Sequence, residues 1–171
     1  MFMKNPFMPD LIKETIYDID FDELLSTGTK LIIFDIDNTL APYEMPEPDS
    51  KLHDFFEMLK HKGFIFAFAS NNNGDRVEIF NNELGAYYIS NAKKPFTKAF
   101  RQILEKYNAA PQEAVGIGDQ IFTDICAANL CGMKSIMVFP IKDKTTLFFR
   151  FKRFMEKPFI WHYNKTKGVK K

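Results

Sequence analysis

Two carboxylates and a hydroxyl follow a short apolar run in residues 31–40, LIIFDIDNTL. Asp35 and Asp37 stand two residues apart, and Thr39 comes two residues later. Carboxylates this close repel each other unless a cation or a proton separates them, and Mg²⁺ is a hard cation that prefers oxygen ligands. The segment therefore indicates a metal-binding catalytic site, although an acidic turn at the end of a strand would give the same letters.

Three later positions carry side chains that suit a phosphate or a metal ion. Ser70 is followed by three asparagines, and a hydroxyl with free backbone N–H groups ahead of a helix can cradle a phosphate. Lys94 precedes a proline, and Gly118 opens the segment GDQIFTD, which contains Asp119 and Asp124. Each has an ordinary alternative, because serine and asparagine form caps and turns and charged residues usually face solvent.

The segments that must position these residues alternate between two patterns. Apolar runs bounded by polar residues are typical of strands buried in a parallel sheet, and apolar residues three and four apart are typical of amphipathic helices. We expect strands at 31–34, 63–70, 86–90, 114–118 and 134–139, and helices at 51–62, 75–84, 96–107 and 121–131. The alternation predicts an α/β fold, a doubly wound parallel sheet between two layers of helices. The polar residues after its strands would then meet at one crevice.

This ordered set of residues resembles the haloacid dehalogenase (HAD) superfamily of phosphotransferases. DIDNT at 35–39 is similar to the DxDxT of its first motif, Ser70 to its second, Lys94 to its third, and GDQIFTD at 118–124 to the GDxxxxD of its fourth. The resemblance spans residues 31–138. In finer detail, SNNN, KKP and the opening MPDLIKETIYDID look like the YqeG-type branch of subfamily IIIA, which is related to the mitochondrial phosphatidylglycerophosphate phosphatases.

The resemblance implies a HAD-like, Rossmannoid fold and a mechanism. Asp35 would attack phosphorus and carry the phosphoryl group, Asp37 would act as acid and then as base, and Lys94 would offset charge in the transition state. The implied cofactor is Mg²⁺. The implied metal residues are Asp35, Asp37, Asp119 and Asp124, with Asp37 acting through its backbone carbonyl. The implied substrate residues are Thr39, Ser70 and Asn71, and Thr39 is also expected to fix the loop after Asp37.

The motif spacing leaves little room for a cap domain over the site. There are 30 residues between Thr39 and Ser70 and 23 between Ser70 and Lys94, and the expected strands and helices fill most of both intervals. An open site suits a phosphate whose bulk stays outside. Together with this open site, the resemblance to the YqeG-type branch implies a phosphatidylglycerophosphate phosphatase, with two alternatives: a phosphatase on nucleic-acid ends or phosphoproteins, and a non-catalytic partner protein in ribosome assembly.

Length and composition predict one domain. The chain has 171 residues, of which 46% are hydrophobic, and its formal net charge of +1 predicts no particular partner. We expect a single domain over 1–171, with a core at about 28–143 and a basic, aromatic extension at about 145–171. Without an apolar stretch of signal-peptide or membrane-span length, the expected location is cytoplasmic.

The extension at 145–171 has two interpretations. It contains eight lysines and arginines, a single acidic residue, Glu156, and seven aromatic residues. The first interpretation is a terminal helix that packs its aromatic residues on the sheet. The second is a surface for anionic lipid at the inner face of the membrane, for which Arg150, Lys152, Arg153 and Lys157 are candidates. Nucleic acid would use the same residue types.

Overall fold

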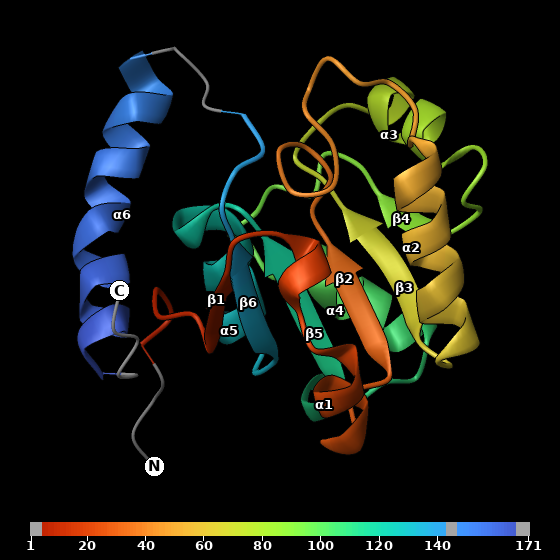
Figure 1. The fold of residues 1–171 in the computed structure, drawn as a ribbon, viewed down its shortest axis with the longest axis horizontal. Helices are drawn as coiled ribbons and strands as arrows, with labels where there is room; N and C mark the ends of the chain where they lie inside the picture. Colours follow the sequence, from red (N-terminus) through yellow and green to blue (C-terminus); the bar gives the residue numbers. More distant parts are fainter. Residues whose placement is uncertain (1–4, 143–146, 167–171) are drawn as a thin grey trace.

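A single parallel sheet of six strands organises the computed structural model, which describes residues 5–142 and 147–166. The strands are β1 (Leu11–Lys13), β2 (Leu31–Phe34), β3 (Ile65–Ala69), β4 (Tyr87–Ile89), β5 (Ala114–Gly118) and β6 (Lys134–Val138). Their order across the sheet is β1-β6-β5-β2-β3-β4 (Figure 1). The chain thus winds outward in both directions from β2 and β5, which confirms the doubly wound sheet expected from the sequence.

The apolar run of β2 explains its central place. All four of its residues are buried, and its register pairs Leu31 with Ile65 on one side and with Ala114 on the other. Successive side chains of a strand point to opposite faces. Ile32 therefore contributes to one hydrophobic cluster and Ile33 to the other, so the strand binds both helical layers to the sheet.

Helices cover both faces of the sheet. One face carries α1 (Phe21–Ser26), α2 (Ser50–His61) and α3 (Gly74–Asn81), and the other carries α4 (Lys98–Lys106) and α5 (Cys126–Leu130). The first face is rich in aromatic contacts, such as the edge-on packing of Phe56 of α2 against Phe34 at 5.7 Å between ring centroids. The three-layer arrangement follows from the two apolar faces of the strands.

Two elements differ from the expected pattern. The chain before residue 28 supplies β1, which extends the sheet by pairing Leu11 with Ile136 of β6. The expected helix at 121–131 begins instead as a π-helix, η3 (Ile121–Ile125), which continues into α5. π-helical turns of this kind are often found at functional sites.

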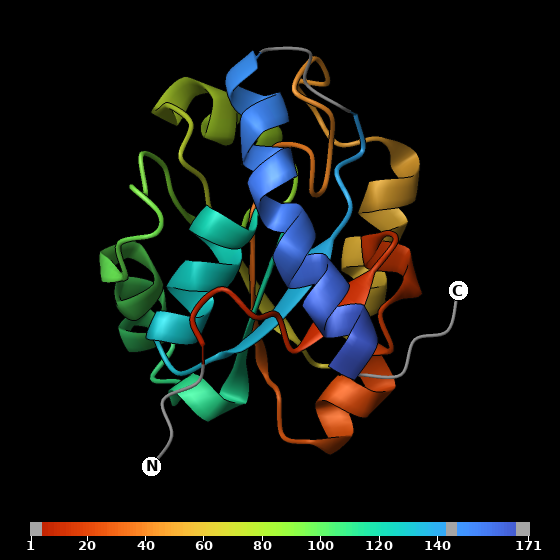
Figure 2. The ribbon, with the colours of Figure 1, turned by 90° about the vertical axis from the view of Figure 1, so that its left-hand side faces the viewer.

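The C-terminal helix α6 (Leu147–Thr166) lies beside the β1 edge of the sheet. It stands at the left in Figure 1 and runs diagonally across the molecule in Figure 2. Phe159 and Ile160 pack against the cluster formed by residues of η3 and β6, and the Tyr163 hydroxyl accepts a hydrogen bond from the backbone N–H of Ile12 at 3.2 Å. One face of α6 is therefore packed on the fold.

The residues described contain no cap domain. The interval between Thr39 and Ser70 holds only a loop, α2 and β3, and the interval between Ser70 and Lys94 holds α3, β4 and their connections. Among the helices of residues 5–142 and 147–166, none combines the length and the apolar character needed to cross a membrane.

Candidate active site

The adjacency of β2 and β5 brings the first and fourth motifs together. Asp35 directly follows β2, and Asp119 directly follows β5. The Asp35 backbone N–H continues the ladder by donating to the carbonyl oxygen of Ile117 at 2.9 Å. The winding of the sheet reverses between these two strands, and open α/β sheets bind ligands at such a point, outside the carboxyl ends of the strands.

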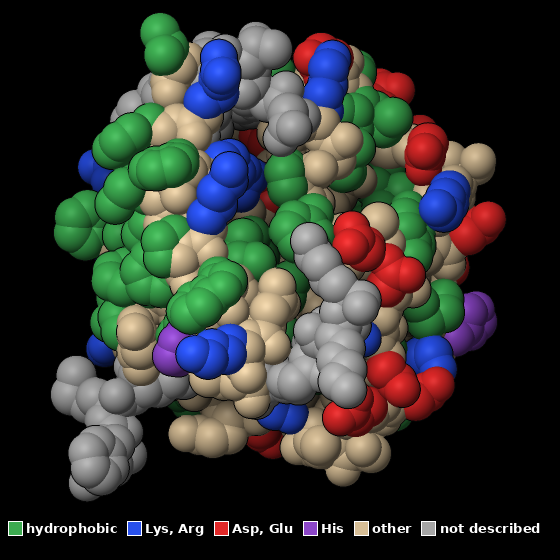
Figure 3. Space-filling view, turned by 60° about the vertical axis from the view of Figure 1, so that its left-hand side comes forward, with side chains coloured by type: hydrophobic (Ala, Val, Ile, Leu, Met, Phe, Trp, Pro, Cys, Tyr) green, Lys and Arg blue, Asp and Glu red, His purple; other side chains and the backbone are tan. Residues whose placement is uncertain are grey.

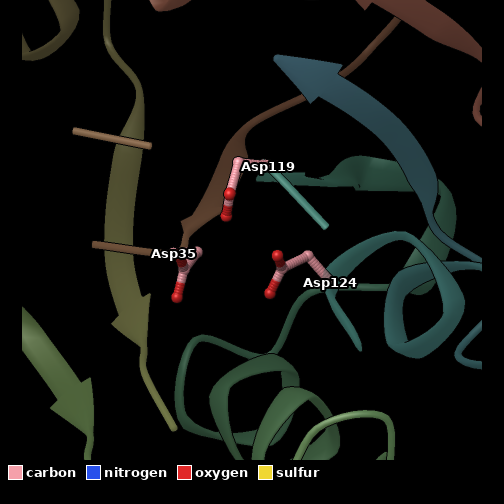
Figure 4. A group of neighbouring side chains, drawn as sticks. All are labelled: Asp35, Asp119 and Asp124. Atoms are coloured by element: carbon pink, nitrogen blue, oxygen red, sulfur yellow. The ribbon is translucent and has the colours of Figure 1, made fainter. Parts of the chain in front are cut away.

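Three buried aspartates gather at this edge. One carboxylate oxygen from each of Asp35, Asp119 and Asp124 lies within 4.8 Å of the others. Figure 4 shows their carboxyl groups converging on one space. Asp119 is fully buried and Asp124 is 4% exposed. Asp124 comes from η3, whose π turn follows closely after β5.

Lys94 places a positive charge among these carboxylates. Its Nζ lies 2.7 Å from Asp35 Oδ1 and 2.6 Å from Asp124 Oδ1, and it donates to the backbone carbonyl oxygen of Ala69 at 2.6 Å. Only 2% of its side chain is exposed. Lys94 therefore bridges the first and fourth motifs from the loop after β4.

Burial shapes the protonation of the cluster. Burial raises the pKa of Asp35 to about 8, against the attraction of Lys94 and with the support of the Asp124 and Asp119 charges. Burial and the neighbouring Asp124 raise the pKa of Asp119 to about 7, although Arg153 opposes the rise. Burial alone would lower the pKa of Lys94, but Asp124 and Asp35 outweigh it and raise the pKa, so the lysine stays charged. Without a further cation, the environment therefore favours protons on Asp35 and Asp119 over full ionisation of the cluster.

The oxygens of this cluster fit a hard divalent cation. Oδ1 of Asp119 is buried and accepts no hydrogen bond from any residue within 5–142 and 147–166. A buried charged oxygen without a partner is costly, and a cation between Asp35, Asp119 and Asp124 would satisfy it. Carboxylate oxygens are the ligands that Mg²⁺ and Ca²⁺ prefer, so the donor set suits a hard divalent cation of this kind.

Both carboxylate oxygens of Asp37 are held by residues around β3 and α3. Asn72 donates from Nδ2 to Oδ2 at 2.9 Å, and Arg76 donates from Nε to Oδ1 at 3.3 Å. Arg76 also donates from Nη1 to the carbonyl oxygen of Pro46 at 2.8 Å, which ties it to the loop before α2. Arg76 was not expected, since the sequence does not distinguish it from a surface arginine in the first turn of a helix.

Ser70 and Asn71 follow β3 and face the same space. The backbone N–H of Asn72 donates to Ser70 Oγ at 3.0 Å, which leaves the hydroxyl proton of Ser70 to donate to an anion. The Asn71 side chain brackets the backbone of Lys94, accepting from its N–H at 2.7 Å and donating to its carbonyl oxygen at 3.1 Å. Asn71 therefore also positions the lysine loop, a role that the sequence did not suggest.

Thr39 supports Asp35. It is 3% exposed, and its hydroxyl donates to Asp35 Oδ2 at 3.3 Å. With Lys94 on Oδ1, both oxygens of Asp35 are held. The structure therefore places the Thr39 hydroxyl against the Asp35 carboxylate.

The site residues surround a pocket of about 270 Å³. Six of its lining residues were expected from the sequence: Asp35, Asp37, Ser70, Asn71, Lys94 and Asp124. Thr39 and Asp119 do not line it. The other lining residues are Tyr43, Asn72, Gln120, Thr123 and Lys152.

Two charged residues of α6 reach this region. Lys152 lines the pocket, and Arg153 contacts Asp119. The lipid interpretation of the extension counted both as surface charges, and the structure turns them toward the aspartate cluster instead. The lone acid Glu156, three residues after Arg153, predicts the ion pair between these two residues, but it does not indicate the contact with Asp119.

Comparisons with known proteins agree with this geometry. The family described as HAD-hydrolase-like matches residues 91–139, which include Lys94, Asp119 and Asp124. The chain is 34% identical over 155 residues to the probable phosphatase YqeG of Bacillus subtilis (strain 168). That alignment covers 91% of this chain and 90% of the relative.

Two solved structures share the fold. The cobalt-bound deoxy-D-mannose-octulosonate 8-phosphate phosphatase (YrbI) from Haemophilus influenzae superimposes with a TM-score of 0.54 at 12% identity, covering 85% of this chain and 95% of that one. The magnesium complex of a HAD family enzyme from Bacteroides thetaiotaomicron gives a TM-score of 0.52 at 13% identity, covering 71% of this chain and 98% of that one. At these identities the likeness concerns the fold alone.

Proposed function

This chain belongs to the YqeG-type phosphatases of the HAD superfamily, and from that premise we propose that it hydrolyses phosphomonoesters with Mg²⁺ through a phosphorylated Asp35. The observation that carries the proposal is the position of Asp35. It stands at the carboxyl edge of the sheet with Lys94 on one oxygen and Thr39 on the other, and it lines the pocket.

In the first step, a carboxylate oxygen of Asp35 forms a bond to phosphorus while the ester oxygen leaves. Asp37 gives its proton to that leaving oxygen. In the second step, Asp37 takes a proton from water, whose oxygen attacks phosphorus and releases Asp35 and inorganic phosphate. The hydrogen bonds from Asn72 and Arg76 to Asp37 support this role, because they fix the direction in which the carboxyl group faces.

The phosphate would be bound by groups that surround the pocket. Ser70 offers its hydroxyl proton and Asn71 its backbone N–H, and Lys94 offsets the charge that spreads over the equatorial oxygens in the transition state. The ion pairs of Lys94 with Asp35 and Asp124 support this, because they hold a permanent positive charge beside the nucleophile.

The residues that would hold Mg²⁺ are Asp35, Asp119 and the backbone carbonyl of Asp37, with Asp124 beside them. When bound, the cation supplies the positive charge that lets an anionic carboxylate approach an anionic phosphate. The unpartnered Oδ1 of Asp119 and the raised pKa values of Asp35 and Asp119 support this site.

For the substrate we propose phosphatidylglycerophosphate or a similarly exposed phosphomonoester on an anionic lipid surface. Two observations support a large substrate whose bulk stays outside: the pocket is small, and the described residues include no cap above it. Small soluble phosphates would leave such a site open to water, so they should be turned over slowly.

The exposed face of α6 supports the proposed contact with an anionic lipid surface. Phe151, Phe154 and Trp161 are each more than 60% exposed, and Arg150 and Lys157 are exposed on the same helix. Figure 3 shows hydrophobic side chains gathered over this helix with Lys and Arg among them, while Asp and Glu gather elsewhere on the same face. Basic residues near an anionic bilayer contribute about 1 kcal/mol each, and aromatic residues add burial at the interface.

The chemistry is tested with a panel of phosphates, assayed with Mg²⁺ and with EDTA. The panel contains phosphatidylglycerophosphate in mixed vesicles, a 5′-phosphorylated oligonucleotide, a phosphoserine peptide and a sugar phosphate. We expect the lipid to be the best substrate, and Asp35→Asn to lose at least about 10³-fold in turnover. The matched control is Asp54→Asn, which changes an exposed aspartate of α2. Turnover of Asp35→Asn near that of the parent would overturn the nucleophile, and a preference for the sugar phosphate would overturn the substrate proposal.

The membrane contact is tested by co-sedimentation with vesicles of graded anionic content. We expect binding to rise with anionic lipid, to weaken with salt, and to weaken in Phe151→Ser and in Arg150→Gln/Lys157→Gln. Trp161 reports insertion, because its emission should shift to the blue on anionic vesicles. Equal binding to neutral and anionic vesicles would contradict the anionic-lipid surface. Displacement by RNA at equal charge would favour the nucleic-acid alternative.

A further inference from the structure

Helix α6 contributes a charged side chain to the aspartate cluster. The guanidinium group of Arg153 donates from Nη1 to the backbone carbonyl oxygen of Asp119 at 2.6 Å and from Nη2 to the Asp119 carboxylate oxygen Oδ2. These partners are 34 residues apart in sequence. An arginine that holds both the backbone and the carboxylate of one residue restricts the rotation of that side chain.

Glu156 holds Arg153 in place from one helical turn further along. The Glu156 side chain is 1% exposed, and its Oε2 accepts from Arg153 Nη1 at 2.8 Å. Its Oε1 accepts from the backbone N–H of Ile121 at 2.9 Å, at the first residue of η3. The Arg153–Glu156 pair thus contacts the chain on both sides of Gln120, and so fixes the start of the π turn that carries Asp124.

The two oxygens of Asp119 consequently have different surroundings. Oδ2 is engaged by Arg153, whereas Oδ1 has no hydrogen-bond partner among the described residues. The free oxygen belongs to the residue whose carboxylate approaches Asp35 and Asp124 within 4.8 Å. If Arg153 and a cation needed the same oxygen of Asp119, Arg153 would have to leave when the cation binds. Because Arg153 engages only Oδ2 of the carboxylate, Oδ1 stays available to the cation.

We propose that Arg153, held by Glu156, is a positioning residue that fixes the Asp119 carboxylate for a divalent cation. The C-terminal helix is then a working part of the site, since it supports a metal ligand from outside the sheet. This inference rests on the proposed metal site at Asp119. Partners of metal ligands commonly affect metal affinity by about 10–100-fold.

The simpler alternative is that Arg153 only helps α6 to dock. The helix has other anchors that do not touch Asp119. Phe159 packs against the rings of Phe7 and Phe122 at centroid distances of 5.7 and 5.9 Å, and Tyr163 bonds to the backbone of Ile12. A variant that weakens docking through these anchors separates the two roles.

The experiment measures Mn²⁺ binding by electron paramagnetic resonance and Mg²⁺ binding by calorimetry in the full chain. Arg153→Met should weaken both affinities about 10–100-fold, Arg153→Lys should recover part of the loss, and Glu156→Gln should give an intermediate loss. The matched controls are Lys157→Met, which removes an exposed charge of α6, and Phe159→Ala, which loosens docking away from Asp119. Hydrogen exchange of the α6 amides reports docking in each variant.

Kinetics supply a second readout. At saturating Mg²⁺, Arg153→Met should recover most of its kcat with its KM for substrate unchanged, since only the metal ligand is misplaced. Equal or tighter metal binding in Arg153→Met, or an equal loss in Phe159→Ala at equal α6 exchange, would overturn the inference and leave the proposed function standing. If the parent protein bound neither Mn²⁺ nor Mg²⁺, the proposed metal site itself would fail.

Discussion

The side chain of Asp124 occupies the space that a Cβ atom on Gly118 would need. Such an atom would lie 2.3 Å from Asp124 Cβ and 2.4 Å from its Cγ, well inside van der Waals contact. Gly118 does not have a positive φ, so its backbone conformation alone does not demand glycine. Glycine is required because the π turn lies close to the end of β5, and this close approach places Asp124 in the cluster.

We therefore predict that Gly118→Ala displaces Asp124 and lowers both stability and phosphatase turnover. Overpacking of this kind costs about 1–3 kcal/mol in the free energy of unfolding, measured by urea denaturation. The matched control is Gly116→Ala on the same strand, whose added Cβ would lie 2.7 Å from Ala128 Cβ in the core. Gly116→Ala should lose similar stability but retain more turnover, and equal losses of turnover in the two variants would contradict the role of Gly118.

Lys94 gives a second prediction, because it is the partner of two buried carboxylates. Lys94→Met leaves Asp35 and Asp124 without their cation, and breaking a buried ion pair costs about 3–5 kcal/mol. Urea denaturation in EDTA measures the loss, and Lys93→Met, at an exposed neighbouring position, is the control. Adding Asp124→Asn to Lys94→Met should restore part of the stability. No recovery in the double variant would indicate that the lysine stabilises the loop by other means.

The positions of the motif residues could be predicted because each depends on a local pattern. An apolar run such as that of β2 must be buried on both faces, and the polar residues that follow it then lie at the carboxyl edge. The proximity of Asp35 and Asp119 required one further step, the adjacency of β2 and β5. The winding of a doubly wound sheet supplies that adjacency.

The contacts of α6 could not be predicted in the same way. Aromatic residues lie on both its packed and its exposed faces, as Phe159 and Phe154 show, so their spacing does not say which face meets the sheet. The pairing of Arg153 with Asp119 depends on that docking. The strand β1 was missed for a related reason, since three residues are too few for an alternating pattern to be recognised.

Arg76 gives a third prediction, because it orients Asp37. Arg76→Met removes the bond to Oδ1 and leaves Asn72 on Oδ2. Asp37→Asn should cost about 10²–10⁴-fold in kcat, the usual contribution of a general acid–base group, and Arg76→Met should cost less. Metal affinity should change little in Arg76→Met, because Arg76 binds the carboxylate of Asp37, whereas the proposed ligand from this residue is its backbone carbonyl. A weakened metal affinity with unchanged kcat would reverse this assignment.

The last prediction concerns stability with and without the cation. Burial raises the pKa of Asp35 to about 8 and that of Asp119 to about 7, from an ordinary value of 3.8. Between these ordinary and raised pKa values, the folded state keeps protons that the unfolded state has already released. The free energy of unfolding without metal should therefore fall as pH rises from about 4 to about 8. Mg²⁺ needs the deprotonated carboxylates, so it should stabilise the protein more at pH 8 than at pH 5.

At a free concentration 100-fold above its dissociation constant, the cation should add about 2.7 kcal/mol. Thermal unfolding in Mg²⁺ and in EDTA at both pH values measures the effect. Asp119→Asn should remove most of it, because this substitution takes away a charged ligand. Equal stabilisation of Asp119→Asn by Mg²⁺ would place the cation elsewhere.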